Sequence, residues 1–212
     1  PWHTRTRLSK VLTVLTHGSA PFITTFLIVH LAAPSIANLG GSALSSQTML
    51  IGREYYQTMF GERYLVFGPL FIHSTCAILK RLFSLRLSRP LSSALSVTGY
   101  ATALFFLPIH VITHRLAPAD PTPPISSLSP SELDYEYVKA ALRGWPVRST
   151  LLYTALVFGV TLHAADGIAV MWSTWAPESK LIPGRRVRQI LTGATVVLVL
   201  NGLAVVAREP LL

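Results

Sequence analysis

Five stretches of low charge, each long enough to cross a lipid bilayer, constrain this chain more than any other feature of its sequence. They cover approximately residues 11–34, 64–85, 91–116, 149–175 and 187–207, and a transmembrane helix needs about 20 predominantly apolar residues. Charged residues make up 13% of the chain and the mean hydropathy is +0.48, whereas soluble domains carry about 25% charged residues. We therefore expect an all-α fold: a polytopic helical bundle of five transmembrane helices forming one domain, residues 1–212.

The amino-terminal residues and the single cysteine say little about the fold. The first apolar stretch is too long for a cleavable signal peptide, and no small-residue cleavage site follows it. The chain begins at Pro1 rather than Met, so we expect a further segment upstream. Cys76 is the single cysteine, which excludes an internal disulfide.

The positive charge is confined to one side of the predicted bundle. With five spans, the amino terminus and the 2–3 and 4–5 connections share a side, which carries eleven basic residues against Glu178 alone. On the other side seven basic residues balance seven acids. The positive-inside rule places the basic side in the cytosol, where it should attract anionic lipid head groups. Topology thus explains the pI near 10.2, and we expect no nucleic-acid binding.

The two long connections on the neutral side each predict a short interfacial helix. In the 1–2 connection, a Gly-Gly-Ser turn at residues 40–42 precedes the amphipathic run "SSQTMLIGREYYQTMF". The 3–4 connection is proline-rich at first and becomes helical from Ser131, with Ser129 or Ser131 as the expected cap.

The histidines indicate a repeated helix pair followed by a fifth helix. "LVFGPLFIHSTCAI" resembles "ALVFGVTLHAADGIAV", which matches His73 to His163. In spans 1 and 3 a small residue, Ser19 or Gly99, precedes His30 or His110 by eleven residues, or three helical turns. A rival register matches "HLAAP" to "HRLAP" and pairs His30 with His114 instead. We prefer His110, because His114 adjoins Arg115 at the helix end and can reach the interface.

Paired histidines at matching depth predict haem b. His73 and His163 fall near the middle of their spans, and His30 and His110 about 10 Å toward the neutral side at 1.5 Å per residue. Facing imidazoles from two helices are what axial ligation requires, so we expect one haem at His73/His163 and a second at His30/His110. The alternative is that these histidines only bond neighbouring helices. A zinc site is disfavoured because the sequence lacks the Cys or Glu residues, or the closely spaced histidines, that would complete a tetrahedral set of ligands.

Three residues around His163 fit a supporting role for the haem. Gly159 and Gly167, four residues before and after it, would clear room for a flat ring. Asp166 would orient the imidazole, or alternatively form an ion pair with Lys80.

The runs "HGSAPFITTFLIVHLAAP", "GGSALSSQTMLIGREYYQ", "LVFGPLFIHSTCAILKR", "SPSELDYEYVKAAL" and "LHAADG" resemble a known family across nearly the whole chain. It is the transmembrane domain of the fungal mitochondrial outer-membrane adaptor that compensates, when abundant, for loss of the ER–mitochondria tether. The resemblance implies a multi-pass outer-membrane protein of lipid homeostasis that recruits a bridge-like lipid transfer protein of the vacuolar-protein-sorting class. It also implies phospholipid scrambling, and it places the recruiting motif in an amino-terminal cytosolic tail ahead of these residues.

The histidine layout separately resembles the cytochrome b anchor of succinate dehydrogenases and fumarate reductases, in pattern only. Two function classes follow. One is a lipid-handling adaptor and membrane receptor with no enzymatic chemistry. The alternative is a b-type cytochrome for electron transfer or haem sensing.

The predicted orientation can be tested by proteolysis of intact mitochondria. Because positive charge favours the cytosolic side, added protease should cut near Arg86 or Arg185 and spare residues 119–147. Immunoblots of the fragments would report the sites. Cleavage within 119–147 alone would reverse the orientation.

Overall fold

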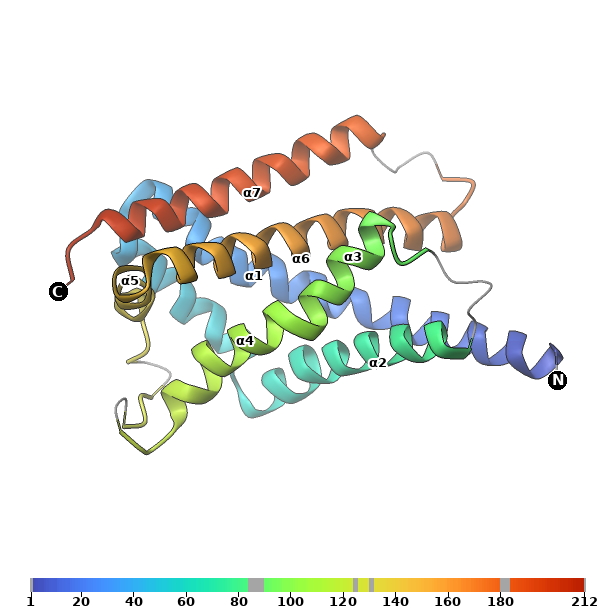
Figure 1. The fold of residues 1–212 in the computed structure, drawn as a ribbon, viewed down its shortest axis with the longest axis horizontal. Coiled ribbons are helices and arrows are strands. Elements are labelled where there is room, and N and C mark those ends of the chain that lie inside the picture. The colour runs from blue at the N-terminus through green and yellow to red at the C-terminus, as the bar shows by residue number, and fades with distance from the viewer. Residues whose placement is uncertain (1, 84–89, 124–125, 130–131, 180–183, 212) are drawn as a thin grey trace. The chain divides into compact units, whose positions relative to one another are not determined.

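The computed structural model describes residues 2–83, 90–123, 126–129, 132–179 and 184–211, and every element within these ranges is helical (Figure 1). The described residues include five helices long and apolar enough to cross a membrane: Arg7–Tyr56, Gly61–Phe83, Ala94–Ala119, Pro146–Trp175 and Arg185–Arg208. Each overlaps one of the five predicted stretches, and the first, Arg7–Tyr56, also includes residues of the 1–2 connection. The all-α architecture with five helices long enough to span a membrane is confirmed.

Several of these spans are built from more than one element. The α-helices are α1 (Trp2–Tyr56), α2 (Gly68–Phe83), α3 (Ala94–Ala101), α4 (Leu107–Val111), α5 (Tyr135–Gly144), α6 (Pro146–Trp175) and α7 (Arg185–Arg208). The π-helical segments are η1 (Gly61–Phe67), η2 (Thr102–Phe106) and η3 (Ile112–Leu116), and Ala117–Ala119 (η4) is a 3₁₀ turn.

Each π-helical segment ends two residues before a proline: Pro69, Pro108 or Pro118. A proline has no N–H, and its ring clashes with the carbonyl four residues earlier. The residue before each proline donates instead to the carbonyl five residues back. These bonds join Gly68 to Arg63, Leu107 to Thr102 and Ala117 to Ile112. The second and third spans therefore continue through their prolines as unbroken helices.

The first helix breaks at the predicted Gly-Gly turn. Gly40 (φ −146°, ψ 23°) and Gly41 (φ 60°, ψ −155°) leave the helical conformation inside α1. A positive φ is accessible to glycine because it has no Cβ. A Cβ on Gly41 would also lie 1.9 Å from Oε1 of Glu209. Residues 42–56 consequently form a separate helix, which confirms the helix predicted in the 1–2 connection.

The end of this connection helix lies against the first span. A Cβ added to Gly52 would lie 3.1 Å from Cγ1 of Val29, so the absence of a side chain permits close approach. Four residues later, the ring of Tyr56 meets Phe26 edge-on with the centroids 5.2 Å apart. The "GREYY" run therefore has a packing role, since its glycine and its last tyrosine both contact the first helix.

Contacts divide the chain into two compact units: Pro1–His30 with Gly52–Ser93, and Leu31–Ile51 with Ala94–Leu212. In the first unit α2 packs against the early part of α1, where Nζ of Lys80 donates to Oγ1 of Thr13 at 2.7 Å. In the second unit α6 packs against both α3 and α7. The buried core of the second unit includes two clusters of small apolar side chains: Ala33, Ala37, Tyr135 and Val206 in one, and Val157, Val196 and Val199 in the other.

Small and amide side chains join α7 to the end of the first span within the second unit. A Cβ on Gly202 would lie 1.8 Å from the carbonyl oxygen of Pro34. Nearby, Nδ2 of Asn201 donates to Oδ1 of Asn38 at 2.5 Å, and Nδ2 of Asn38 donates to the Leu198 carbonyl at 2.8 Å. Close backbone approach and interhelical hydrogen bonds are the usual means of joining helices in lipid.

The helix in the 3–4 connection is confirmed, but its predicted cap is wrong. Asp134 caps α5, because its carboxylate accepts the Glu136 N–H at 2.8 Å. The N–H of Ser129 is instead bonded to the Glu132 carboxylate at 2.8 Å, in a turn that precedes the helix. Ser131 lies outside the described residues. Aspartate and serine cap helices about equally well. The helix begins after Asp134 because the turn that joins Ser129 to Glu132 comes before it.

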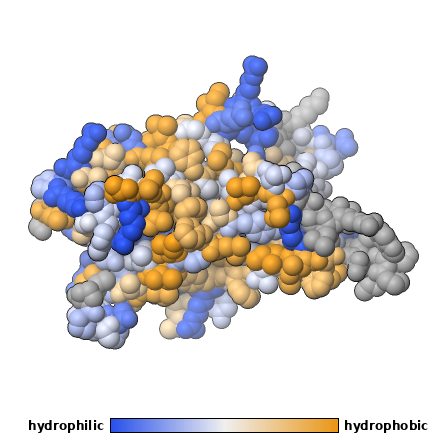
Figure 2. Space-filling view, in the orientation of Figure 1, coloured by the Kyte–Doolittle hydropathy of each residue, from blue (hydrophilic) through white to orange (hydrophobic). Residues whose placement is uncertain are grey.

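Apolar side chains make up much of the surface shown in Figure 2, with hydrophilic side chains among them. Large apolar side chains are strongly exposed on every span, among them Ile28 (68%), Phe71 (73%), Leu104 (63%), Leu151 (64%) and Ile190 (69%). Water would penalise such a surface by about 25 cal/mol per Å² of apolar area. Hydrocarbon removes that penalty, so these faces are suited to contact with lipid tails.

Candidate functional site

His73 hydrogen-bonds to the neighbouring helix of its own unit. Its Nδ1 lies 2.9 Å from the carbonyl oxygen of Thr16 and 3.4 Å from Oγ of Ser19, both on α1. A carbonyl can only accept, so Nδ1 carries the hydrogen. A neutral imidazole has one donor and one acceptor nitrogen, and the lone pair is therefore on Nε2.

His163 has the same arrangement in the second unit. Its Nδ1 lies 3.0 Å from the carbonyl oxygen of Leu95 on α3, which again makes Nδ1 the donor. The ring packs on Gly99, where an added Cβ would lie 2.5 Å from Cε1. Leu95, and not Asp166, therefore accepts the Nδ1 hydrogen of this imidazole.

The two helix pairs share a recognisable pattern. Ser19 and Gly99 are the small residues matched by the repeat, and each contacts the central histidine of its pair. A small residue at this point allows the imidazole to approach the backbone of the adjacent helix. His73 belongs to the first unit and His163 to the second, so their pairing with one another stays a prediction.

His30 and His110 have different surroundings. The His30 ring stacks on Phe26, with 5.1 Å between centroids, and meets Tyr56 edge-on at 5.9 Å. His110 instead contacts His114, with centroids 4.6 Å apart. These two histidines also belong to different units, and a second haem between them likewise stays a prediction.

His114 takes part in an aromatic cluster that the sequence alone did not indicate. Its Nε2 lies 2.9 Å from the hydroxyl of Tyr153, and the two rings stack at 5.6 Å. Tyr137 of α5 meets the same imidazole edge-on at 5.7 Å and donates its hydroxyl to the Thr113 carbonyl at 2.9 Å. Burial raises the pKa of Tyr137, which keeps this phenol protonated as a donor.

The residues expected to support a haem near His163 lie in contrasting environments. Gly159 packs on Thr102, whose Oγ1 would be 2.4 Å from an added Cβ, so helix contact alone explains this glycine. Gly167 has nothing within 4 Å of an added Cβ. Asp166 is half-buried on α6. Across the described part of the chain no group of three or more His, Cys, Asp or Glu side chains could hold a metal ion.

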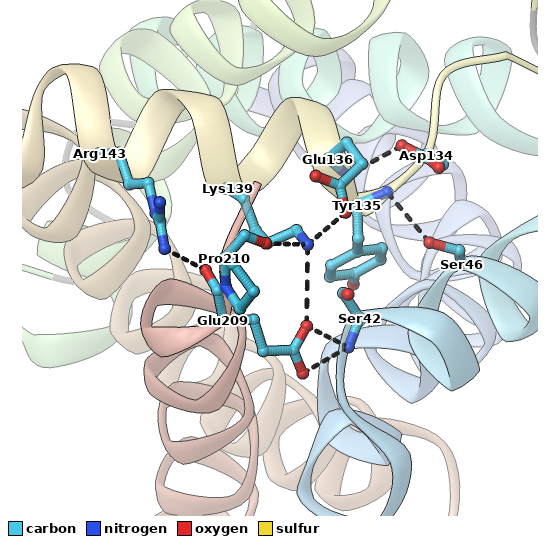
Figure 3. Close-up of polar contacts among 9 residues, drawn as sticks. All are labelled: Ser42, Ser46, Asp134, Tyr135, Glu136, Lys139, Arg143, Glu209 and Pro210. Carbon is cyan, nitrogen blue, oxygen red and sulfur yellow. Dashed lines mark hydrogen bonds and ion pairs between the residues drawn. The ribbon is translucent and has the colours of Figure 1, made fainter. Parts of the chain in front are cut away.

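A polar cluster around Lys139 was missed by sequence reasoning (Figure 3). The Lys139 cluster comprises Ser42, Ser46, Asp134, Tyr135, Glu136, Lys139, Arg143, Glu209 and Pro210. Lys139 is only 2% exposed, and its Nζ donates to the Pro210 carbonyl at 2.8 Å. Glu136 pairs with this ammonium group, and Oε2 of Glu209 lies 3.8 Å from it.

Glu209 connects the cluster to the helix that follows the Gly-Gly break. Both of its carboxylate oxygens accept the backbone N–H of Ser42, at 3.0 and 3.1 Å. The first N–H groups of a helix have no partner within it, and the helix dipole favours an anion there. Arg143 donates to the Glu209 carbonyl, which holds the same residue from the side of α5.

The Lys139 cluster joins three segments far apart in the sequence. They are the helix 42–56, α5 and the residues after α7, which come from the 1–2 connection, the 3–4 connection and the carboxyl end. An arrangement of five spans places these segments on one side of the bilayer, and their contacts agree with that. The available signal was Lys139 itself, which lies on the apolar face of α5 with Tyr135 and Leu142.

Replacing the buried lysine should destabilise the protein. Lys139→Met leaves two carboxylates without their cation, and breaking a buried ion pair is costly. Glu136 and Glu209 are 28% and 29% exposed, which reduces the effect. We expect a loss of about 2 kcal/mol and a melting midpoint lower by about 4–8 °C, measured by thermal unfolding in detergent.

Arg148→Met is the matched control. Its guanidinium is exposed and lies 4.4 Å from the centroid of the Trp145 ring, so its loss should cost less than about 1 kcal/mol. The same midpoint in both variants and the parent protein would show that the buried pair adds no stability.

Comparison with known proteins identifies the family. A family model described as the transmembrane domain of MDM10-complementing protein 1 matches residues 105–210, which is half of the chain. The matched region includes His110, His163 and most of the Lys139 cluster. No curated protein and no solved structure matches the chain. With five apolar helices long enough to cross a membrane, this is a multi-pass membrane protein, and it belongs to the MDM10-complementing protein 1 transmembrane-domain family.

Proposed function

We propose that this protein acts in lipid homeostasis at the mitochondrial outer membrane, as a membrane receptor or adaptor for a bridge-like lipid transfer protein. The observation that carries the proposal is the family match over residues 105–210. The "GREYYQ" and "LHAADG" runs resemble the outer-membrane adaptor, and this resemblance supports the part of the proposal that concerns lipid transfer. In this proposal the basic connections and the amino terminus face the cytosol, and the protein is not an enzyme.

Phospholipid scrambling is part of the proposal, because a bridge-like protein delivers lipid to one leaflet only. Polar side chains within the spans offer head groups a path of lower energy than hydrocarbon does. Ser19, Thr24 and Thr25 lie on the first helix, where each hydroxyl donates to a carbonyl three or four residues earlier. The hydroxyls of Thr24 and Thr25 keep a lone pair for a passing head group, whereas Ser19 is buried against His73. Asp166 lies within the fourth span.

Scrambling can be measured with purified protein in liposomes that contain a fluorescent phospholipid. Dithionite reduces only the outer leaflet, so bleaching stops near half without transport. We expect bleaching well beyond half when the protein is inserted. Bleaching that stops near half, with insertion shown by protease accessibility, would restrict the proposal to the adaptor role.

Haem b ligation by His73 and His163 is the second candidate, and the tautomer of both imidazoles favours it. Each Nδ1 donates to a backbone carbonyl, which leaves Nε2 as the nitrogen with the lone pair that iron requires. A bound haem would supply one-electron chemistry or serve as a structural link. Under this alternative the protein is a b-type cytochrome for electron transfer or haem sensing, with His30 and His110 holding a second haem.

An absorption spectrum tests the haem proposal. Protein expressed with ample haem should show a sharp Soret band and split visible bands on reduction, as expected for two histidine ligands. His73→Ala or His163→Ala should abolish the central haem, whereas His30→Ala or His110→Ala should remove at most a second one. The aromatic cluster provides a matched control, His114→Ala, which should leave both haems bound. Colourless protein with only the 280 nm peak would make these histidines packing residues.

A further inference from the structure

Asp166 is an acid deep within a membrane span. The other acids in the five described spans are Glu54 and Glu62, which lie near the ends of theirs. Asp166 lies nine residues before Trp175, the last residue of α6, or about 14 Å along the axis at 1.5 Å per residue. A charged carboxylate within a membrane span is costly unless a partner lies close at hand.

Within the described residues, Asp166 has no hydrogen-bond or ion-pair partner. Its polar neighbour one turn earlier on α6 bonds elsewhere: Nδ1 of His163 donates to the Leu95 carbonyl at 3.0 Å. His163, three residues earlier, interacts electrostatically with Asp166, but its imidazole donates its hydrogen to Leu95. A carboxylate so placed is uncompensated by its own unit.

The carboxylate lies at the edge of an outward-facing surface of α6. At about 100° per residue, Asp166 is about 60° around the helix from His163, which faces α3, and about 40° from Leu162. Leu162 is 41% exposed and Phe158, one turn earlier, is 45% exposed. Next to Asp166, Gly167 has nothing within 4 Å of an added Cβ. A group from outside the helix pair can therefore approach this carboxylate.

We propose that Asp166 binds the primary ammonium group of a phospholipid head group, such as that of phosphatidylethanolamine, as the lipid moves along α6. This inference rests on the proposed scrambling function and names its substrate class. A primary ammonium both neutralises the carboxylate and donates hydrogen bonds to it, and charge-assisted bonds of this kind are the stronger ones. A metal ion would need further ligands, which the described residues do not supply.

Transport of three lipids tests the assignment. Each probe carries its fluorophore on an acyl chain, so that the ethanolamine, choline or glycerol head group is native. Asp166→Asn keeps the shape and removes the charge, and should slow the ethanolamine probe on the order of ten- to a hundredfold, the effect of one charge-assisted bond. The choline probe should slow less, because it cannot donate hydrogen bonds, and the glycerol probe should not slow. Asp166→Glu should restore most of the ethanolamine rate.

Glu54→Gln is the control, since Glu54 is an exposed acid on the connection helix 42–56, and it should leave all three rates unchanged. Equal slowing of the three probes by Asp166→Asn would overturn the inference and indicate a structural role. An unchanged ethanolamine rate would overturn it as well.

A binding measurement separates failure of this inference from failure of the scrambling proposal. In detergent, added phosphatidylethanolamine should raise the melting midpoint of the parent protein more than phosphatidylcholine does, because both lipids are zwitterionic and only the first donates hydrogen bonds, and Asp166→Asn should abolish the difference. If the parent protein transports no probe but shows this difference, Asp166 is an ammonium site in a protein that does not scramble. Without transport and without the difference, both proposals fail.

Discussion

The structure depends on one constraint: a polar group inside a bilayer has no water to bond, so it must find a partner within the protein. The described backbone within the spans meets this constraint as helix, and even the prolines are accommodated by hydrogen bonds to the carbonyl five residues back. Hydroxyl groups meet it within their own helix, as Thr24 and Thr161 do. His73 and His163 meet it by donating to a carbonyl of the adjacent helix. Within the described part of the chain, Oγ1 of Thr102 and Nε1 of Trp172 are buried without a hydrogen-bond partner, and the Asp166 side chain also lacks one. Asp166 differs from these two because its carboxyl group can carry a charge, and for that reason it carries the proposal of a head-group site.

The same constraint explains why the two glycines at positions 40 and 41 matter. A helix that breaks leaves N–H groups without partners, and Glu209 accepts the first of them from Ser42. A carboxylate at that point needs a cation, and the buried Lys139 supplies one from α5. The helix that begins after this break therefore contacts Glu209 at the carboxyl end, and Glu209 in turn contacts Lys139 of the 3–4 connection. The side opposite the basic connections is thus held by charge and hydrogen bonds as well as by apolar packing.

The lipid and haem proposals draw on different parts of the chain and are compatible. Scrambling needs a polar path along the outside of helices, and Asp166 lies on α6 beside the exposed Leu162. Haem ligation needs imidazoles held with Nδ1 as donor, and both central histidines have this tautomer. A haem would then stabilise the bundle while lipids move on its exterior. The family assignment is independent of both proposals, since it comes from residues 105–210 as a whole.

The five spans, the Gly-Gly break and the helix in each long connection could be predicted from the sequence, because hydrophobic length and turn chemistry are local properties. The sequence also indicated the repeated pair, in which Ser19 and Gly99 contact equivalent histidines. Only the tertiary structure showed that Leu95 accepts the His163 hydrogen, that Thr102 packs on Gly159 and that Lys139 meets Glu209. These contacts join residues distant in the sequence, and their geometry depends on how helices approach one another. The spacing of residues within one helix does not predict how that helix packs against another.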